Sequence, residues 1–207
     1  MRSTTLALLG LLAAVSAAAD ERQVLLLIGP PGAGKGTQAE FITRKYGLPS
    51  VSTGELLRAE VKAGTELGKS LAPIMAKGEL VSDEVVNQLV ADRLAKPDAA
   101  RGIILDGYPR TVPQAKYLDE LLAWRGLPKV TVLHIDLPEA EIISRLTARG
   151  RADDKPEVIR DRIKVYARDT EPILAHYAGA GYHRIEGTGT PKEVFDRIER
   201  VLAPSRR

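Results

Sequence analysis

A glycine-rich segment around a lysine has the residue types needed to bind phosphate. Residues 29–37 are Gly-Pro-Pro-Gly-Ala-Gly-Lys-Gly-Thr. The glycines leave room for a ligand to approach the backbone N–H groups and permit unusual φ angles. At a helix start, unpaired N–H donors and the helix dipole favour negative charge, and Lys35 adds a cation that can reach the β- and γ-phosphates of a nucleotide. We therefore expect polyphosphate contacts from Gly32, Ala33, Gly34, Lys35, Gly36 and Thr37.

The flanking sequence has the order that a P-loop requires. Residues 24–28 form a continuous aliphatic run, typical of a parallel strand buried on both faces. A helical segment follows from about Lys35 to Lys45, and this context argues against a glycine-rich turn without function. In the general motif a Ser or Thr hydroxyl directly after the lysine meets Mg²⁺, whereas here Gly36 follows the lysine and Thr37 comes one position later.

Polar side chains after a second apolar strand form another candidate group. Residues 102–105 lead to Asp106, where a carboxylate beside the P-loop can hold water on Mg²⁺. Arg110 follows, and a guanidinium makes paired hydrogen bonds to phosphate that lysine cannot. Gln114 lies one helical turn later, on the same side. Its amide offers a donor and an acceptor, which suits the edge of adenine, although on spacing alone a solvated surface glutamine is the better interpretation.

Arginines gather in the last third of the chain. Arg145 and Arg149 are four residues apart and share a helix face, and Arg151 and Arg162 follow. One interpretation is an ordinary solvated helix face, on which nearby carboxylates pair with the arginines. We favour a functional role for the arginines, because phosphoryl transfer needs several cations around one group.

The elements that must position these residues alternate as in a βαβ architecture. Further strands are predicted over 130–135 and 182–185, and helices over 82–94, 138–148, from about 155, and from 190 onwards. Ser82 is expected to cap the helix over 82–94, with Asp83 and Glu84 in its first turn. Asp154 with Glu157 is expected to cap the helix that starts at about 155. We predict one doubly wound α/β domain.

Several residues have weaker claims to function. Trp124 is expected to be partial core, and Tyr166 to pack helices. His134 lies within an apolar strand, and the histidines show no metal-ligand spacing, so we expect structural or surface roles for them.

Composition narrows the classes of function further. The 207 residues are 44% hydrophobic and 28% charged, with a net charge of +3, which suits a soluble domain. Basic residues are interleaved with acidic ones rather than massed, so we expect a small polyanion rather than a nucleic acid as partner. The chain has no cysteine, which excludes disulfides, cysteine nucleophiles and Cys-ligated zinc.

The first residues differ from the rest. Arg2 precedes an apolar or small stretch from Leu6 to Ala19, and charged residues begin at Asp20. This is the layout of a signal peptide with an A-x-A cleavage site, and the stretch is too short for a convincing transmembrane span. We predict a signal peptide over 1–19 and therefore an exported or periplasmic protein. The alternatives are a disordered extension or misplaced start codon, with a cytoplasmic protein.

Three segments between residues 34 and 114 resemble motifs of the adenylate kinase family. Gly-Lys-Gly-Thr at 34–37 is the family's form of the P-loop. Residues 52–58, Ser-Thr-Gly-Glu-Leu-Leu-Arg, resemble its monophosphate-binding motif. Residues 106–111, Asp-Gly-Tyr-Pro-Arg-Thr, followed by Gln114, resemble its DG[FY]PRT signature.

The second half continues the resemblance in the family's order. Residues 149–154 with Arg162 resemble the lid arginines and their helix, and Gly-Thr-Gly at 187–189 resembles the loop near the ATP base. The resemblance covers essentially everything after Gln23 and is to the short-lid type. The spacing at the lid and the missing cysteines rule out long-lid relatives and their zinc-binding versions.

The resemblance implies a fold and a domain plan. The fold would be a P-loop three-layer α/β/α architecture with a five-stranded parallel sheet. One adenylate kinase domain would span 20–207, with a small AMP-binding helical insert at 52–81 and a very short lid at 148–154.

The same resemblance implies roles for individual residues. ATP would be bound by the P-loop residues together with Arg145, Arg149 and Gly189. AMP would be bound by Thr53, Arg58, Glu79, Leu80, Val81, Gly107, Tyr108, Pro109, Arg110, Gln114, Arg151 and Arg162. The catalytic residues would be Lys35, Asp106, Arg110, Arg151 and Arg162. No side chain would bind the metal directly, because Asp106 would reach Mg²⁺ through water.

The implied activity is reversible phosphoryl transfer, ATP + AMP = 2 ADP, with Mg²⁺ as cofactor and a role in adenine nucleotide homeostasis. ATP, AMP and ADP would be the partners of a monomer with no nucleic-acid partner and no membrane association in the mature chain. Uridylate/cytidylate kinases are similar, but they tend to carry Ala where this chain has Thr53 and Asn where it has Thr111. The remaining alternative is an exported, inactive nucleotide-binding protein.

Overall fold

A five-stranded parallel sheet forms the centre of the protein. The computed structural model describes residues 22–151, 153–179 and 181–203, so the predicted signal peptide at 1–19 lies outside the described residues. The strands follow the order β2-β3-β1-β4-β5, and every neighbouring pair is parallel. Their bounds are β1 (Gln23–Ile28), β2 (Ser50–Ser52), β3 (Gly102–Asp106), β4 (Val130–Asp136) and β5 (Tyr182–Glu186).

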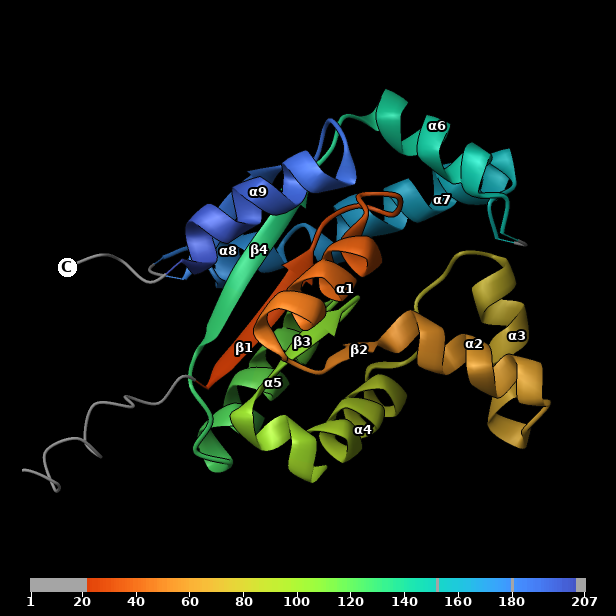
Figure 1. Ribbon diagram of the computed structural model, residues 1–207. Helices are drawn as coiled ribbons and strands as arrows, with labels where there is room; N and C mark the ends of the chain where they lie inside the picture. The colour runs from red at the N-terminus through yellow and green to blue at the C-terminus, as the bar shows by residue number, and fades with distance from the viewer. Residues whose placement is uncertain (1–21, 152, 180, 204–207) are drawn as a thin grey trace, which may run out of the picture.

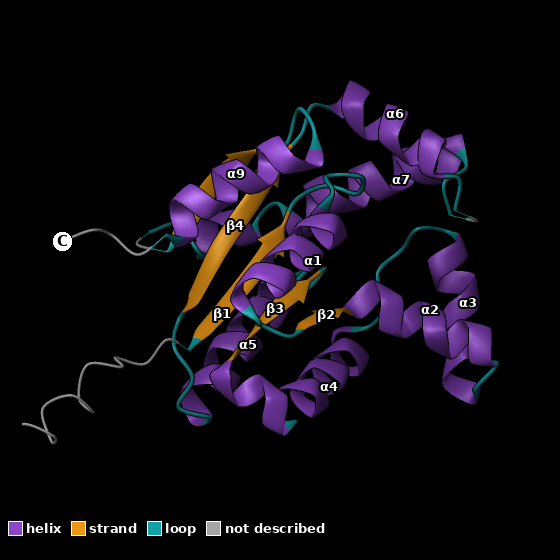
Figure 2. Cartoon of the chain, viewed as in Figure 1, coloured by secondary structure: helices purple, strands orange, loops and turns teal. Residues whose placement is uncertain are grey.

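Helices cover both faces of this sheet (Figures 1 and 2). They are α1 (Lys35–Tyr46), α2 (Thr53–Ala63), α3 (Glu66–Ala76), α4 (Asp83–Leu94), α5 (Val112–Trp124), α6 (Glu139–Arg149), α7 (Pro156–Val165), α8 (Ile173–His176) and α9 (Pro191–Leu202). A 3₁₀ turn (Pro97–Arg101) precedes β3, and a π-helical turn (Tyr166–Thr170) follows α7. The predicted three-layer α/β/α fold with a five-stranded parallel sheet is confirmed.

The alternation of side chains along β1 divides the core into two layers. Val24, Leu26 and Ile28 face one cluster, which α4, α5 and α8 complete. Leu25 and Leu27 face the other, which α1, α6, α7 and α9 complete. Successive strand side chains point to opposite faces, so an aliphatic run without polar interruptions is what a sheet covered on both faces requires.

Helices α2 and α3 lie together beyond the edge of the sheet and occupy the region of the predicted insert (Figure 1). Their contact is close because Gly68 of α3 sits against the backbone of α2. A Cβ atom at Gly68 would lie 2.0 Å from the carbonyl oxygen of Glu60. Helices α6 and α7 lie apart from this insert (Figure 1), and the short segment that joins them carries Arg151.

Most predicted helix boundaries agree with the structure to within a residue or two. Thr190 and Glu193 form a capping box at the start of α9, with Pro191 in the first turn. Ser82 occupies the N-cap position of α4 without a side-chain capping bond. The three-residue strand β2 was not located from the sequence, since it is too short to show an alternating pattern.

Two local predictions are wrong. Trp124 ends α5 with 80% of its surface exposed, and its ring lies 5.5 Å from the guanidinium carbon of Arg125. Asp154 does not cap α7, because Lys155 is the N-cap residue and makes no side-chain capping bond. The Asp154 carboxylate instead binds arginines, as described below. Among the described residues, no helix is both long and apolar enough to cross a membrane.

Candidate active site

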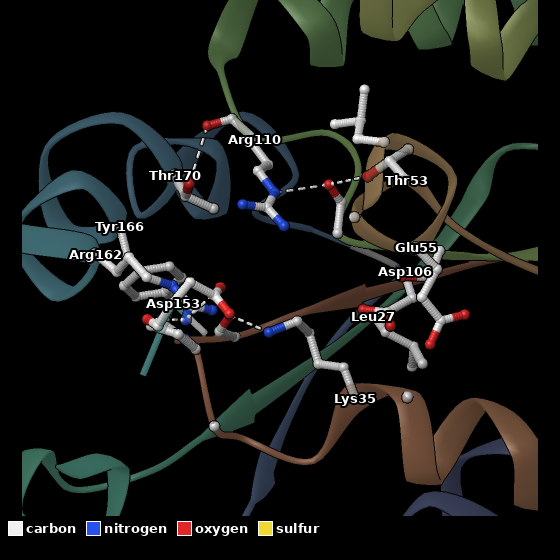
Figure 3. A pocket seen from close by; sticks show the side chains of 18 of the residues that line it. Leu27, Lys35, Thr53, Glu55, Asp106, Arg110, Asp153, Arg162, Tyr166 and Thr170 are labelled. Carbon is white, nitrogen blue, oxygen red and sulfur yellow. Dashed lines mark hydrogen bonds and ion pairs between the residues drawn. The ribbon is translucent and has the colours of Figure 1, made fainter. Parts of the chain in front are cut away.

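A cavity of about 410 Å³ lies beyond the carboxyl ends of β1 and β3, and Figure 3 shows part of its lining. The P-loop, the start of α2, residues 78–81, the segment after β3 and the lid arginines all contribute to its wall. Its volume falls in the range of small-molecule sites. In parallel α/β sheets, ligands bind outside the carboxyl ends of the strands, where connections leave in opposite directions.

The P-loop is held tightly against the sheet where β1 ends. A Cβ atom at Gly29 would lie 2.3 Å from the carbonyl oxygen of Ile135 in β4, so only glycine permits this approach. Gly34 is the N-cap residue of α1 and has φ +86°, a conformation that side chains rarely adopt. The loop thereby directs the start of α1 towards the cavity, as an anion site requires.

Lys35 lies in this loop with its ammonium group folded back onto backbone carbonyls. Its Nζ donates hydrogen bonds to the oxygens of Gly29 at 2.7 Å and Pro30 at 2.9 Å. Part of the side chain remains accessible to solvent, but the protein packed around the ammonium lowers the pKa of Lys35 to about 8, against the opposing effect of Asp106. Arg110, Arg162 and Arg149 lower this pKa further, which shows how closely the cations gather.

Asp106 ends β3 opposite the start of α1. Its side chain is largely buried, at 9% exposure. A Cβ atom at Gly36 would lie 3.6 Å from Asp106 Oδ2, so the glycine after the lysine leaves space next to this carboxylate. A buried carboxylate beside an open phosphate loop has the chemistry of a site for hydrated Mg²⁺.

Two side chains meet at the backbone of Gly107, on the opposite side of the cavity from the P-loop (Figure 3). Arg110 Nε and Thr53 Oγ1 both donate to the Gly107 carbonyl oxygen, at 2.9 and 2.8 Å. Thr170 Oγ1 donates to the carbonyl oxygen of Arg110 at 3.0 Å. Burial lowers the pKa of Arg110, although Asp106 opposes the shift. No hydrogen bond joins its Nη groups to another described residue, so they are available to an anion.

Arg58 of α2 lines the same side of the cavity. Burial and the nearby Arg151 guanidinium both lower the pKa of Arg58. Two cations that interact across the gap between α2 and the lid make a strongly anion-attracting space.

Asp154 binds arginines of α6, of α7 and of the segment that joins the two helices. Its side chain is fully buried and accepts from Arg149 Nε at 2.9 Å and Arg149 Nη2 at 2.7 Å. It also accepts from the Arg151 backbone N–H at 2.9 Å and Arg162 Nη1 at 3.1 Å. Burial would raise the pKa of Asp154, but the bonds from Arg149 and Arg151 lower it overall. Asp153 Oδ2 lies 2.9 Å from Arg162 Nη1, so two carboxylates fix the guanidinium groups beside the cavity.

Arg145 is positioned differently from the other lid arginines. Its Nη2 donates to the carbonyl oxygen of Gly187 at 3.0 Å, and its Nε donates to Glu141 at 3.1 Å. The side chain therefore bridges α6 and the loop after β5 at the rim of the cavity.

Most residues predicted for the site line this one cavity. They are Gly32, Gly34, Lys35, Gly36, Thr37, Thr53, Arg58, Glu79, Leu80, Val81, Asp106, Gly107, Pro109, Arg110, Gln114, Arg145, Arg149, Arg151 and Arg162. These residues come from segments between Gly32 and Arg162 that are far apart in the chain.

Three predicted site residues are not among the lining residues. Ala33 is packed in the core under the P-loop. Tyr108 is fully buried, and its hydroxyl donates to Asn87 Oδ1 at 2.6 Å. Gly189 lies just before α9, where a Cβ atom would sit 2.5 Å from Glu193 Oε2.

Sequence reasoning missed Tyr166 and Thr170, which line the cavity from the π-helical turn. The Tyr166 hydroxyl lies 3.3 Å from His134 Nε2, and His134 Nδ1 lies 2.7 Å from the Tyr182 hydroxyl. Burial lowers the pKa of His134, and its contacts with two tyrosine hydroxyls fit the structural role expected from the sequence. For this cluster around Tyr166, the sequence showed no signal other than a histidine inside an apolar strand.

Asp83 is a third missed residue. Its carboxylate accepts from Gln114 Nε2 at 2.7 Å and from Thr111 Oγ1 at 2.9 Å. The sequence indicated only an acidic residue in the first turn of a helix, which is a common position for one.

Comparisons with known proteins relate most of the chain to one family. The family model described as adenylate kinase matches residues 27–182. An adenylate kinase of Brucella anthropi is 46% identical over 192 residues, covering 87% of this chain and 99% of the relative. Adenylate kinases of Brucella ovis and Brucella canis are each 45% identical over the same lengths. Since the family model spans most of the chain and these relatives match it over nearly their whole length, the chain belongs to the adenylate kinase family.

Proposed function

We propose that the cavity holds ATP and AMP end to end and transfers the γ-phosphoryl group between them in the roles set out here. Membership of the family makes the chain a phosphotransferase of the nucleoside monophosphate kinase type, and ATP, AMP and ADP are its substrates. The observation that supports the assignment of residues is the convergence of Lys35, Arg110, Arg149 and Arg162 around one cavity beside Asp106.

ATP occupies the P-loop side in this proposal. Its phosphates lie over the N–H groups at the start of α1, and Lys35 leaves its two carbonyl partners to bind the β- and γ-phosphates. Arg149 lies above the transferred group, and Arg145 lies at the rim nearer the base.

AMP occupies the side between β3 and α2. The Nη groups of Arg110 and the guanidinium of Arg58 bind its phosphate, while Thr53, Gln114 and the backbone of residues 79–81 surround its nucleoside. These residues all line the cavity, and Arg110 and Thr53 share the Gly107 carbonyl. Thr53 and Thr111 also favour AMP as the substrate, because uridylate/cytidylate kinases tend to carry Ala and Asn at these two positions.

Transfer is an in-line attack by an AMP phosphate oxygen on the γ-phosphorus of ATP. The nucleophile is already an anion, so the reaction needs no strong general base. Lys35, Arg110, Arg151 and Arg162 neutralise charge on the transferred group, and the carboxylates of Asp153 and Asp154 orient the guanidinium of Arg162 in advance. Positioned cations in an enclosed site are the main source of rate enhancement in such reactions.

The donor set fits hydrated Mg²⁺ better than a directly bound metal. The described residues hold no group of three or more His, Cys, Asp or Glu side chains suited to direct coordination. Among the described residues, Asp106 alone has a side chain that faces the space beside Gly36. Thr37 directly follows Gly36 in the chain. Asp106 would hold the waters of the ion, which would supply positive charge to the phosphates.

Replacement of the P-loop lysine tests this assignment. Lys35→Met should lower kcat on the order of 10²–10³-fold, because loss of one positioned donor to the transition state has that effect. Initial rates with ATP and AMP measure it. Lys116→Met is the matched control, because Lys116 is exposed on α5 and its loss should leave the rate unchanged. Near-normal activity of Lys35→Met, or a preference of the unaltered protein for CMP over AMP, would contradict the proposal.

We further propose that residues 1–19 are removed on export and that the mature protein is a monomer without a nucleic-acid or membrane partner. The N-terminal layout described above supports export. N-terminal sequencing of the protein from its native host checks the cleavage, and a mature chain that retains Leu6–Ala19 would contradict it. Light scattering during size-exclusion chromatography measures the mass in solution.

A further inference from the structure

We infer that Asp83 is a positioning residue that fixes the orientation of the Gln114 amide and thereby selects a 6-aminopurine over a 6-oxopurine in the monophosphate. The inference rests on the proposed role of Gln114 in contacting the base of AMP. It adds a residue that sits outside the cavity lining and acts on the substrate through another side chain.

The Gln114 amide is held by partners of opposite character at its two ends. Its Oε1 accepts the backbone N–H of Arg110 at 2.7 Å, and its Nε2 donates to Asp83 Oδ1 at 2.7 Å. A backbone N–H only donates and a carboxylate only accepts. Rotation of the amide by half a turn would therefore place donor against donor at Arg110 and acceptor against acceptor at Asp83.

Asp83 is itself fixed by a second bond. Thr111, the N-cap residue of α5, donates its hydroxyl hydrogen to Asp83 Oδ2 at 2.9 Å, and the same oxygen of Thr111 accepts the Gln114 backbone N–H at 3.2 Å. Asp83 is the first residue of α4. The start of α4 thus holds both the backbone and the side chain of the first turn of α5.

The fixed amide retains one N–H donor and one acceptor lone pair for a ligand. Gln114 is only 2% exposed, yet it lines the cavity. An adenine presents an amino donor at C6 and an acceptor at N1, while a 6-oxopurine presents an acceptor at C6 and a donor at N1. Both can pair with a glutamine amide that is free to turn. An amide of fixed orientation complements only one of them, because the other leaves buried groups unpaired.

Asp83 fixes the amino end of the Gln114 amide, as the Arg110 backbone N–H fixes its oxygen end. An asparagine at position 83 has the same size but can present either its oxygen or its amino group to Gln114. Asp83→Asn therefore removes the bias at the amino end without removing volume, and Asp83→Ala removes the partner altogether.

The experiment compares AMP with IMP as phosphoryl acceptor in the full-length enzyme. For Asp83→Ala we expect kcat/KM for AMP to fall roughly ten-fold, mainly through KM, because a hydrogen bond to a charged group is lost. The ratio of kcat/KM for AMP to that for IMP should fall by a similar factor. Asp83→Asn should change this ratio in the same direction. Dissociation constants for AMP and IMP give a second readout that does not depend on turnover.

Glu84→Gln is the matched control. Glu84 is exposed in the same first turn of α4, so this variant removes the same charge from the helix N-terminus without touching Gln114. Its AMP-to-IMP ratio should equal that of the unaltered enzyme. An equal loss of selectivity in Glu84→Gln would show that the helix charge, rather than the contact to Gln114, is responsible and would overturn the inference.

The Gln114→Ala background separates positioning from a general structural role. Once the amide is gone, adding Asp83→Ala should change the AMP-to-IMP ratio no further, even if it lowers stability. A further fall in the ratio would overturn the inference. If Gln114→Ala lowers the ratio and Asp83→Ala does not, the inference alone fails. If Gln114→Ala itself leaves the ratio unchanged, the proposed role of Gln114 fails as well.

Discussion

At the scale of single residues, Lys35 combines a charge with a costly environment. Among the described residues, its ammonium donates only to carbonyl oxygens of its own loop, and burial lowers its pKa to about 8. A cation held without a formal counter-charge in contact is ready to bind phosphate, because the incoming anion supplies the missing compensation. The same environment makes the residue sensitive to pH.

ATP binding should therefore weaken as pH rises through about 8. Above that pH the free protein holds Lys35 neutral, and bound phosphates raise its pKa again, so binding takes up a proton. Calorimetry at about pH 8.5 in two buffers of different ionisation enthalpy measures this uptake. Lys35→Arg stays charged and should show no such uptake from this position. Identical proton uptake in the two proteins would contradict the assignment.

The sign for stability is the reverse of that for binding. A lysine in the unfolded chain titrates near 10.5 and so binds more protons than the folded protein between about pH 8 and that value. The contribution of Lys35 to the free energy of unfolding should therefore rise with pH across this window.

At the scale of elements, the insert formed by α2 and α3 depends on one close backbone contact. Gly68 lies against Glu60 at the crossing of the two helices, and Leu57 and Leu71 are their buried apolar residues. Thr53 and Arg58 belong to α2. The position of two candidate AMP contacts thus follows from how closely the two helices pack.

Gly68→Ala should disturb this insert selectively. Its Cβ would lie 2.0 Å from the Glu60 oxygen, so the helices must separate, and overpacking of this kind costs about 1–3 kcal/mol. We expect KM for AMP to rise several-fold while KM for ATP changes little, together with a lower Tm. Ser70→Ala, on the exposed side of α3, serves as control. Equal changes in both KM values would count against a separate role of the insert.

At the scale of the whole molecule, the cavity joins regions that are far apart in the sequence. Lys35 follows β1, Arg110 follows β3, and Arg162 lies in α7. The central position of β1, with β3 on one side and β4 on the other, brings them to the same edge of the sheet. In the proposed arrangement two nucleotides meet there, one on each side of the central strand of the sheet.

A mimic of two adenosines joined through phosphates should bind across the whole cavity and raise Tm more than ATP or AMP alone. A ligand that binds only the folded state stabilises it by about 4 kcal/mol at a thousand times its Kd. Lys35→Met and Arg110→Ala should each reduce the shift with the mimic, whereas Arg110→Ala should leave the shift with ATP nearly intact. A mimic that stabilises no better than ATP would contradict the end-to-end arrangement.

Local chemistry in the sequence was sufficient for four of the five strands, the P-loop and several helix ends. The aliphatic run of β1 and the capping box of Thr190 with Glu193 depend on neighbours within a few residues, so their physics is visible in the linear chain. The same holds for the glycines around Lys35, whose backbone conformation few other residues adopt. The order of the motifs was also enough to identify the family.

Only the tertiary structure decided the contacts between residues far apart in the chain. The pairing of Asp83 with Gln114 depends on how α4 packs beside α5, and the arginine contacts of Asp154 depend on the angle between α6 and α7. The exposure of Trp124 depends on where the core beneath α5 ends. Side chains such as these acquire their roles from the packing of whole elements, and that packing is the sum of many weak contacts that no short pattern in the sequence records.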